Sequence, residues 1–139
     1  MMLLRFVARA GRYTWPALYS AMGLVLGFVT VLAGASVRVQ GGTLEFGGGR
    51  AGKLVSRLPA PFAFSAITLG HVIVGIDAAA LAASRRHEQV HVRQYERWGL
   101  LFVPAYLFSS LVQLARGRNP YRDNCFEREA CAKAAADLV

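Results

Sequence analysis

The chain has 139 residues, of which 55% are apolar and 17% are charged. This composition excludes a disordered chain, and two cysteines are too few for a disulfide scaffold or a four-cysteine zinc module. The net charge of +8 comes mostly from arginine and requires a surface or a partner to explain it.

The N-terminal segment has the pattern of a membrane anchor. No charged residue lies between Tyr13 and Val37. About 20 apolar residues are enough to span a bilayer core of roughly 30 Å. We therefore expect residues 1–35 to form a single N-terminal pass. A cleaved signal peptide and a helix buried in a soluble fold are the alternatives.

Two further expectations concern this segment. Three arginines precede it, which favours an N-terminus inside the cell and the remaining chain on the extracytoplasmic side. Gly23 and Gly27 form a GxxxG pair, which would let two copies of the helix approach closely in a homodimer.

The middle of the chain, residues 36–76, has the pattern of antiparallel strands. Two alternating segments flank Gly41-Gly42, which predicts a hairpin, and a second pair of strands is separated by Gly70. Glycine-rich and proline-containing stretches between the pairs predict loops.

Helices are expected after these strands. Asp77 is a candidate N-cap for a long helix that ends near Gly99. The apolar segment 98–115 follows, and a final alanine-rich helix is expected after a cap at Asp123 or Asn124. The arginines of the long helix do not indicate nucleic-acid binding, because no aromatic interleaving, phosphate loop or recognition module accompanies them.

The long helix contains the motif that indicates chemistry. His87 and His91 are one helical turn apart and point the same way, so both imidazoles can bind one zinc ion. Glu88 lies on a neighbouring part of the helix surface and can act as general base toward a water activated by the metal. This H-E-x-x-H spacing predicts a zinc hydrolase.

A catalytic zinc site needs a third protein ligand and one open position. His71 is expected to be a strand residue, and Glu96 points to a different face of the helix. The remaining candidates are Glu127 and Glu129 in the final helix.

With H-E-x-x-H followed by Glu127-Arg128-Glu129-Ala130, the chain resembles the gluzincins, zinc peptidases in which a glutamate from a later helix completes the site. The resemblance is to a small, minigluzincin-like domain and covers roughly residues 65–131. It implies Glu127 as the third ligand, with Glu129 as the alternative.

The chain departs from the family pattern at one position. Family members often carry aspartate four residues after the ligand glutamate, where it supports a histidine. Cys131 occupies that position here, and Gln94 is a candidate replacement for the missing carboxylate. Glu127 can also close a capping box with Asn124, which is compatible with metal binding.

The metal site constrains the apolar segment 98–115. If that segment crossed a bilayer, the two histidines and Glu127 would lie on opposite sides of it and could not share an ion. The segment must therefore fold back, and Gly99 and Pro104 make a bend reasonable.

The expected fold is α+β. A small antiparallel sheet packs on a zincin-like active-site helix and a C-terminal glutamate helix, in a domain of residues 36–139 behind the N-terminal hydrophobic helix. The expected function is a membrane-associated zinc metallopeptidase that acts on peptides or proteins and contacts membrane lipid. The alternative is a zincin-fold membrane protein that is structural or mediates interactions without catalysis.

Overall fold

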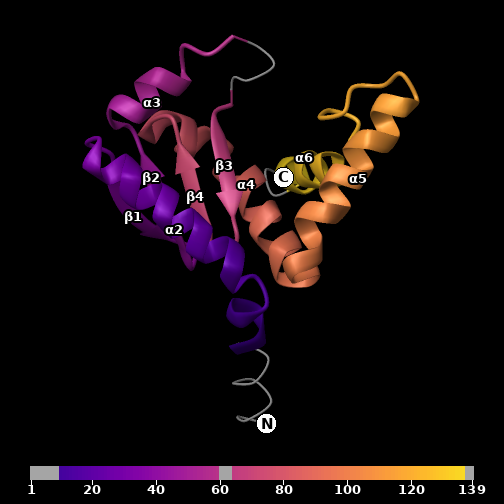
Figure 1. Ribbon diagram of the computed structural model, residues 1–139, viewed down its shortest axis with the longest axis horizontal. Coiled ribbons are helices and arrows are strands. Elements are labelled where there is room, and N and C mark those ends of the chain that lie inside the picture. Colours follow the sequence, from indigo (N-terminus) through magenta and orange to yellow (C-terminus); the bar gives the residue numbers. More distant parts are fainter. Residues whose placement is uncertain (1–9, 60–63, 137–139) are drawn as a thin grey trace.

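Helices pack around a small sheet in the computed structural model (Figure 1). It describes residues 10–59 and 64–136. Within them the protein is mixed α+β, as the sequence predicts. In chain order the elements are α2 (Ala17–Leu32), β1 (Ser36–Gln40), β2 (Thr43–Gly47), α3 (Gly49–Val55), β3 (Ala66–Leu69), β4 (Val72–Gly75), α4 (Ala78–Trp98), the 3-10 turn η1 (Gly99–Leu101), α5 (Phe102–Ala115) and α6 (Cys125–Ala136).

The sheet is mixed, which corrects the expectation that it is antiparallel throughout. Its strand order is β1-β2-β4-β3. Both expected hairpins form, and Gly41 and Gly42 have the positive φ angles that a two-residue turn requires. However, β4 lies parallel to β2. Parallel strands need a crossover connection, and α3 with the residues after it supplies one. Residue alternation predicts each hairpin but not how two hairpins join.

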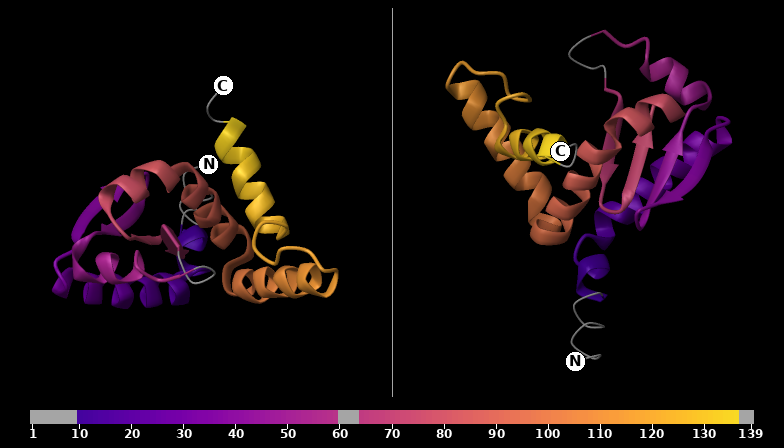
Figure 2. Two further views of the ribbon diagram at one scale, coloured as in Figure 1. Left: turned by 90° about the horizontal axis from the view of Figure 1, so that it is seen from above. Right: turned by 180° about the vertical axis from the view of Figure 1, so that it is seen from behind.

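Strand β4 lies at the centre of the core, with α2 on one face of the sheet and α4 on the other (Figure 2, left). Its four residues are buried, as expected for a strand covered on both faces. One apolar cluster, toward α2, contains Val31, Leu44, Phe46, Val72 and Val74, and the other, toward α4, contains Ile73, Leu81 and Val92.

Helix α2 reaches the sheet through small residues. A Cβ atom on Gly23 would lie 2.7 Å from Cβ of Val72, and one on Gly27 would lie 2.6 Å from the ring of Phe46. The glycine pair that suggested a homodimer therefore allows close contact between α2 and the sheet of the same chain. A second copy of the helix would have to displace these side chains to use the same face.

The N-terminal helix α2 is shorter than a membrane span. Helix α2 has 16 residues, which gives a length of about 24 Å against a bilayer core of roughly 30 Å. Among residues 10–59 and 64–136, the helical run that is long and apolar enough to cross a membrane, by length and composition only, is Ala78–Ala115. The expectation of a single N-terminal pass is corrected accordingly.

The run Ala78–Ala115 is bent. Gly99 has φ +55°, and α4 and α5 leave this point in different directions (Figure 1). The chain then returns through residues 116–124 to α6, which lies against α4. The segment 98–115 thus folds back, as the zinc hypothesis requires.

Side chains cap both helices that carry the motif residues. The Asp77 carboxylate accepts a hydrogen bond from the backbone N–H of Ala80 at the start of α4. At the start of α6, the Asn124 side chain accepts from the N–H of Phe126 and donates to the carbonyl of Tyr106. Asn124 rather than Asp123 is therefore the cap, and it also fixes α6 to α5.

Candidate metal centre

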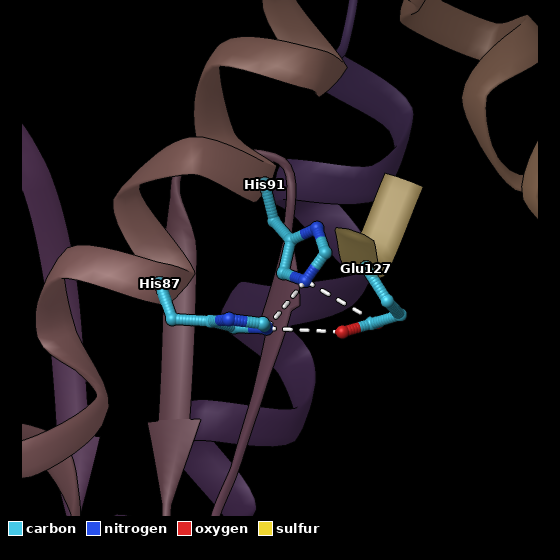
Figure 3. A group of neighbouring side chains, drawn as sticks. All are labelled: His87, His91 and Glu127. Atoms are coloured by element: carbon cyan, nitrogen blue, oxygen red, sulfur yellow. Dashed lines mark hydrogen bonds and ion pairs between the residues drawn. The ribbon is translucent and has the colours of Figure 1, made fainter. Parts of the chain in front are cut away.

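Two histidines of α4 form one side of the centre. His87 and His91 are a turn apart, and their Nε2 atoms lie 3.0 Å from each other (Figure 3). Both project from the helix toward the first turn of α6. The helical spacing alone accounts for this arrangement, as the sequence predicts.

Glu127 completes the group from α6. Its Oε2 lies 3.0 Å from Nε2 of His87, and its Oε1 lies 3.3 Å from Nε2 of His91 (Figure 3). The hydroxyl of Tyr106 on α5 donates a hydrogen bond to Oε1 at 2.6 Å. The carboxylate is buried. Three helices thus position the three candidate ligand atoms.

The donor set fits a metal ion. Tetrahedral zinc with ligand bonds of about 2.0–2.1 Å places neighbouring ligand atoms about 3.3 Å apart, close to the separations of 3.0–3.3 Å observed here. In addition, Oε2 of Glu127 is buried, and no described residue donates a well-aligned hydrogen bond to it. The group His87, His91 and Glu127 could therefore hold a metal ion.

Gln94 holds the ring of His91. Its Oε1 lies 2.8 Å from Nδ1 of His91, and its Nε2 donates to the carbonyl of Phe126 and to Glu129. Because both partners of the amide nitrogen are acceptors, the amide orientation is fixed, and Nδ1 of His91 must carry the proton. In the neutral ring, the lone pair on Nε2 of His91 then faces the centre, where a metal would bind. The candidate replacement for a supporting carboxylate is thus in contact with a histidine.

Cys131 lies beside the other histidine. Its Sγ is 3.8 Å from Nδ1 of His87. Position 131, the departure from the gluzincin pattern noted in the sequence, therefore faces a histidine ring. A thiol is a weaker hydrogen-bond acceptor than a carboxylate, so His87 has the weaker support of the two candidate ligand histidines.

The other candidate ligands lie elsewhere. Glu129 contacts Gln94, Arg97 and Lys133 rather than the histidines. His71 and Glu96 pair with each other at 3.2 Å, away from the group. The structure thus brings Glu127, and not Glu129, to the two histidines.

Electrostatic coupling within the group shifts two pKa values. Burial alone would raise the pKa of Glu127, but the contacts with His87 and His91 and the hydrogen bond from Tyr106 outweigh it and hold the pKa well below its usual value. Burial would lower the pKa of His91, but Glu127 outweighs it, so this pKa is raised. Without a metal the group favours an ionised carboxylate beside a protonated imidazole.

Glu88 opens on the same cavity as the ligand group. Its Oε2 accepts a hydrogen bond of 2.6 Å from the hydroxyl of Thr68 on β3, and the side chain is buried. It is not part of the ligand group. This is the arrangement that a general base needs, with the carboxylate held in place beside the centre but not used to bind it.

A cavity of about 1300 Å³ contains the group. One wall is strand β3, a second is α4, and a third is formed by α5 with the loop before α6. It is lined mainly by apolar side chains, among them Ile67, Phe102 and Val103. Its lining also includes the polar residues His87, Glu88, His91 and Glu127. Such a mixture is typical of a binding site for an organic ligand.

Thr68 and Tyr106 belong to the site but are not singled out by the sequence. Thr68 lies in an ordinary strand pattern, and Tyr106 lies in a segment that reads only as apolar. Their roles depend on β3 and α5 packing beside α4, which no local pattern encodes. A polar tip within an apolar run is the only signal that could have indicated Tyr106.

Comparisons with protein families, curated proteins and solved structures gave no match for this chain.

Proposed function

We propose that this protein is a membrane-associated zinc metallopeptidase of the gluzincin type. The observation that carries the proposal is the convergence of His87, His91 and Glu127 on one point, with Glu88 on the same cavity. Two imidazoles and a carboxylate are a donor set of catalytic zinc sites, in which a fourth position stays open. A purely structural site would have no use for the additional carboxylate of Glu88.

His87, His91 and Glu127 are the residues that would hold zinc. A zinc ion in such a site acts as a Lewis acid that activates water and polarises a carbonyl group. Glu88 moves the proton. Thr68 occupies Oε2, which leaves Oε1 to accept a proton from the attacking water and to deliver it to the leaving amine.

An extended peptide is the substrate that the cavity fits best. Strand β3 lines the cavity and is at an edge of the sheet, and among residues 10–59 and 64–136 it pairs only with β4. Its outer backbone groups can pair with an added strand, which would place a peptide bond along the cavity. The apolar lining would accept apolar side chains of that peptide.

Metal content and activity test the proposal on detergent-purified full-length protein. We expect about one zinc ion per chain by mass spectrometry, because the three ligands form a single site. Zinc should be lost in His87→Ala and Glu127→Gln. Glu129→Gln is the matched control, because this carboxylate lies on the same helix outside the group, and it should keep zinc.

Glu88→Gln tests catalysis separately from metal binding. It should retain zinc and lose at least about 100-fold of the hydrolysis of a fluorogenic peptide library, because general-base catalysis typically contributes about 10²–10⁴-fold. A zinc-free wild type, or full activity of Glu88→Gln, would contradict the proposal. Zinc without hydrolysis in the wild type would instead support the non-catalytic zincin-fold module.

A further inference from the structure

Two helices expose apolar side chains along most of their length. Neither α2 nor α5 contains a charged residue. Phe28 on α2 is 62% exposed, and Phe108 on α5 is 69% exposed. Further exposed apolar side chains are Val25 and Leu32 on α2, and Leu111 and Leu114 on α5. So many exposed apolar side chains on two helices are unusual for a protein surrounded only by water.

The two helices lie on the same side of the molecule. Viewed from above, α2 and α5 both run along one edge, with the sheet, α4 and α6 on the other side (Figure 2, left). Their N-terminal ends approach each other and their C-terminal ends diverge (Figure 1). The outward sides of α2 and α5 therefore form one surface, called here the α2/α5 face.

Taken by themselves, α2 and α5 are each shorter than the hydrocarbon core, and both pack against the rest of the fold. Helices of 16 and 14 residues are about 24 Å and 21 Å long, against a hydrocarbon core of roughly 30 Å. The inner side of α2 packs on the sheet, and the inner side of α5 packs on Tyr95 and Phe126. A crossing helix would pull this core, and the metal centre with it, into the bilayer.

Positive charge lies at both far ends of the α2/α5 face. Helix α3, beside the end of α2, carries Arg50 and Lys53, and Arg116 and Arg118 follow the end of α5. These four side chains are exposed and form no ion pair with any residue in the described ranges. Unpaired cations at the margins of an apolar surface complement anionic headgroups.

Tryptophans mark the place where the two helices approach each other. Trp15 precedes α2 and contacts Gly99, and Trp98 ends α4 directly before the turn into α5. Both indole rings are partly exposed. Tryptophan is enriched at the membrane–water interface, because one part of its ring is apolar and the N–H is polar.

We propose that the α2/α5 face is a docking surface for an anionic lipid bilayer, with both helices lying flat in the headgroup region. The cations at the ends of the face favour lipid over a second copy of the chain. A symmetric dimer through the same face would bring like charges together, whereas anionic headgroups neutralise them. The docking does not depend on bound zinc or on peptidase activity.

Vesicle binding tests the docking surface. Full-length protein diluted from detergent should float with preformed vesicles of phosphatidylglycerol and phosphatidylcholine, and less with phosphatidylcholine alone or at high salt. Phe28→Asp and Phe108→Asp should each weaken binding about tenfold or more, because an apolar anchor is replaced by a charge of the wrong sign. Val39→Asp is the matched control, since Val39 is 74% exposed on β1, outside the face, and it should bind as wild type.

Labelling of sealed vesicles separates docking from spanning. In a background with Cys125→Ser and Cys131→Ser, Arg50→Cys and Arg118→Cys should both react with an impermeant maleimide added outside. Protection of one of them would show a span and overturn the proposal. The proposal would also be overturned if Phe28→Asp and Phe108→Asp both bound vesicles as well as the wild type does. A wild-type dimer that Phe108→Asp dissociates would overturn it too.

The metal measurement keeps the two proposals separate. Phe28 and Phe108 do not line the cavity, so their variants should retain the zinc content of the wild type. Loss of zinc in His87→Ala without loss of vesicle binding would leave the docking surface intact. Loss of vesicle binding with zinc retained would leave the metal centre intact.

Discussion

The two candidate ligand histidines are held by different neighbours, and this difference governs how each would bind a metal. His91 has an amide oxygen on Nδ1, and that amide is itself fixed by two acceptors. Nδ1 of His87 has only the Cys131 thiol, at 3.8 Å, among the described residues. A carboxylate in the position of that thiol would orient the imidazole and raise its basicity.

Cys131→Asp should therefore strengthen metal binding. We expect zinc affinity to rise about tenfold, the lower end of the range by which such supporting groups alter metal affinity. Competition with a chromophoric chelator measures it. Cys125→Asp is the control, because Cys125 is the other exposed cysteine and makes no contact with His87. Equal affinities of the two variants would contradict the supporting role of position 131.

At the scale of elements, small residues decide how α2 meets the sheet. The stripe of Gly23, Gly27 and Thr30 is the only buried part of this helix, and the rest is exposed or partly exposed. The same glycines in a membrane would predict a helix pair. The two roles can be separated, because a substitution would loosen the fold in one case and a dimer in the other.

Gly23→Leu should destabilise the folded chain. A Cβ atom there already lies 2.7 Å from Val72 and 3.0 Å from the carbonyl oxygen of Leu69, and overpacking of this kind costs about 1–3 kcal/mol. Thermal unfolding followed by circular dichroism measures the cost. Ala21→Leu is the control, because Ala21 is on the exposed side of α2 and should be nearly neutral. If Gly23→Leu instead dissociated a dimer and left the melting temperature unchanged, the glycine pair would serve dimerisation.

At the scale of the whole molecule, the centre joins segments that are far apart in the chain. Helix α4 supplies two candidate ligands, α6 supplies the third, and α5 supplies the hydrogen bond from Tyr106. The bend at Gly99 makes this convergence geometrically feasible. Without a metal, the charged forms of Glu127 and His91 favour each other, so their contribution to the free energy of unfolding depends on pH.

Metal-free protein should show this dependence. The lowered pKa of Glu127 contributes stability above the ordinary value of 4.5, which is lost as pH falls through the lowered pKa. The raised pKa of His91 contributes stability below the ordinary value of 6.5, which is lost as pH rises through the raised pKa. The excess stability of wild type over Glu127→Gln should therefore be greatest between pH 4.5 and 6.5.

Thermal unfolding in chelator across the pH range measures this excess. Glu129→Gln provides the comparison: the pKa of Glu129 is also lowered, chiefly by its hydrogen bond with Lys133, but no histidine is coupled to it. The stability that Glu129→Gln loses relative to wild type should remain at pH values where the difference between wild type and Glu127→Gln has already declined. A difference between wild type and Glu127→Gln that does not vary with pH would contradict the coupling.

Features that depend on local spacing could be predicted from the amino-acid sequence. The turn of helix between His87 and His91, the cap at Asp77 and the hairpin at Gly41-Gly42 follow from periodicities of a few residues. The resemblance to gluzincins pointed to Glu127, which the structure places beside the histidines.

The remaining features could not be predicted, because they depend on contacts between distant segments. The parallel pairing of β2 with β4 needed a crossover that alternation does not reveal. In the sequence, α2 has the pattern of a membrane-spanning helix because it is uniformly apolar. It packs on the sheet through glycines, which a hydropathy pattern does not identify as a contact surface. Thr68 and Tyr106 joined the site only when three elements packed together. Local pattern fixes which atoms share a face, whereas long-range packing fixes which faces meet.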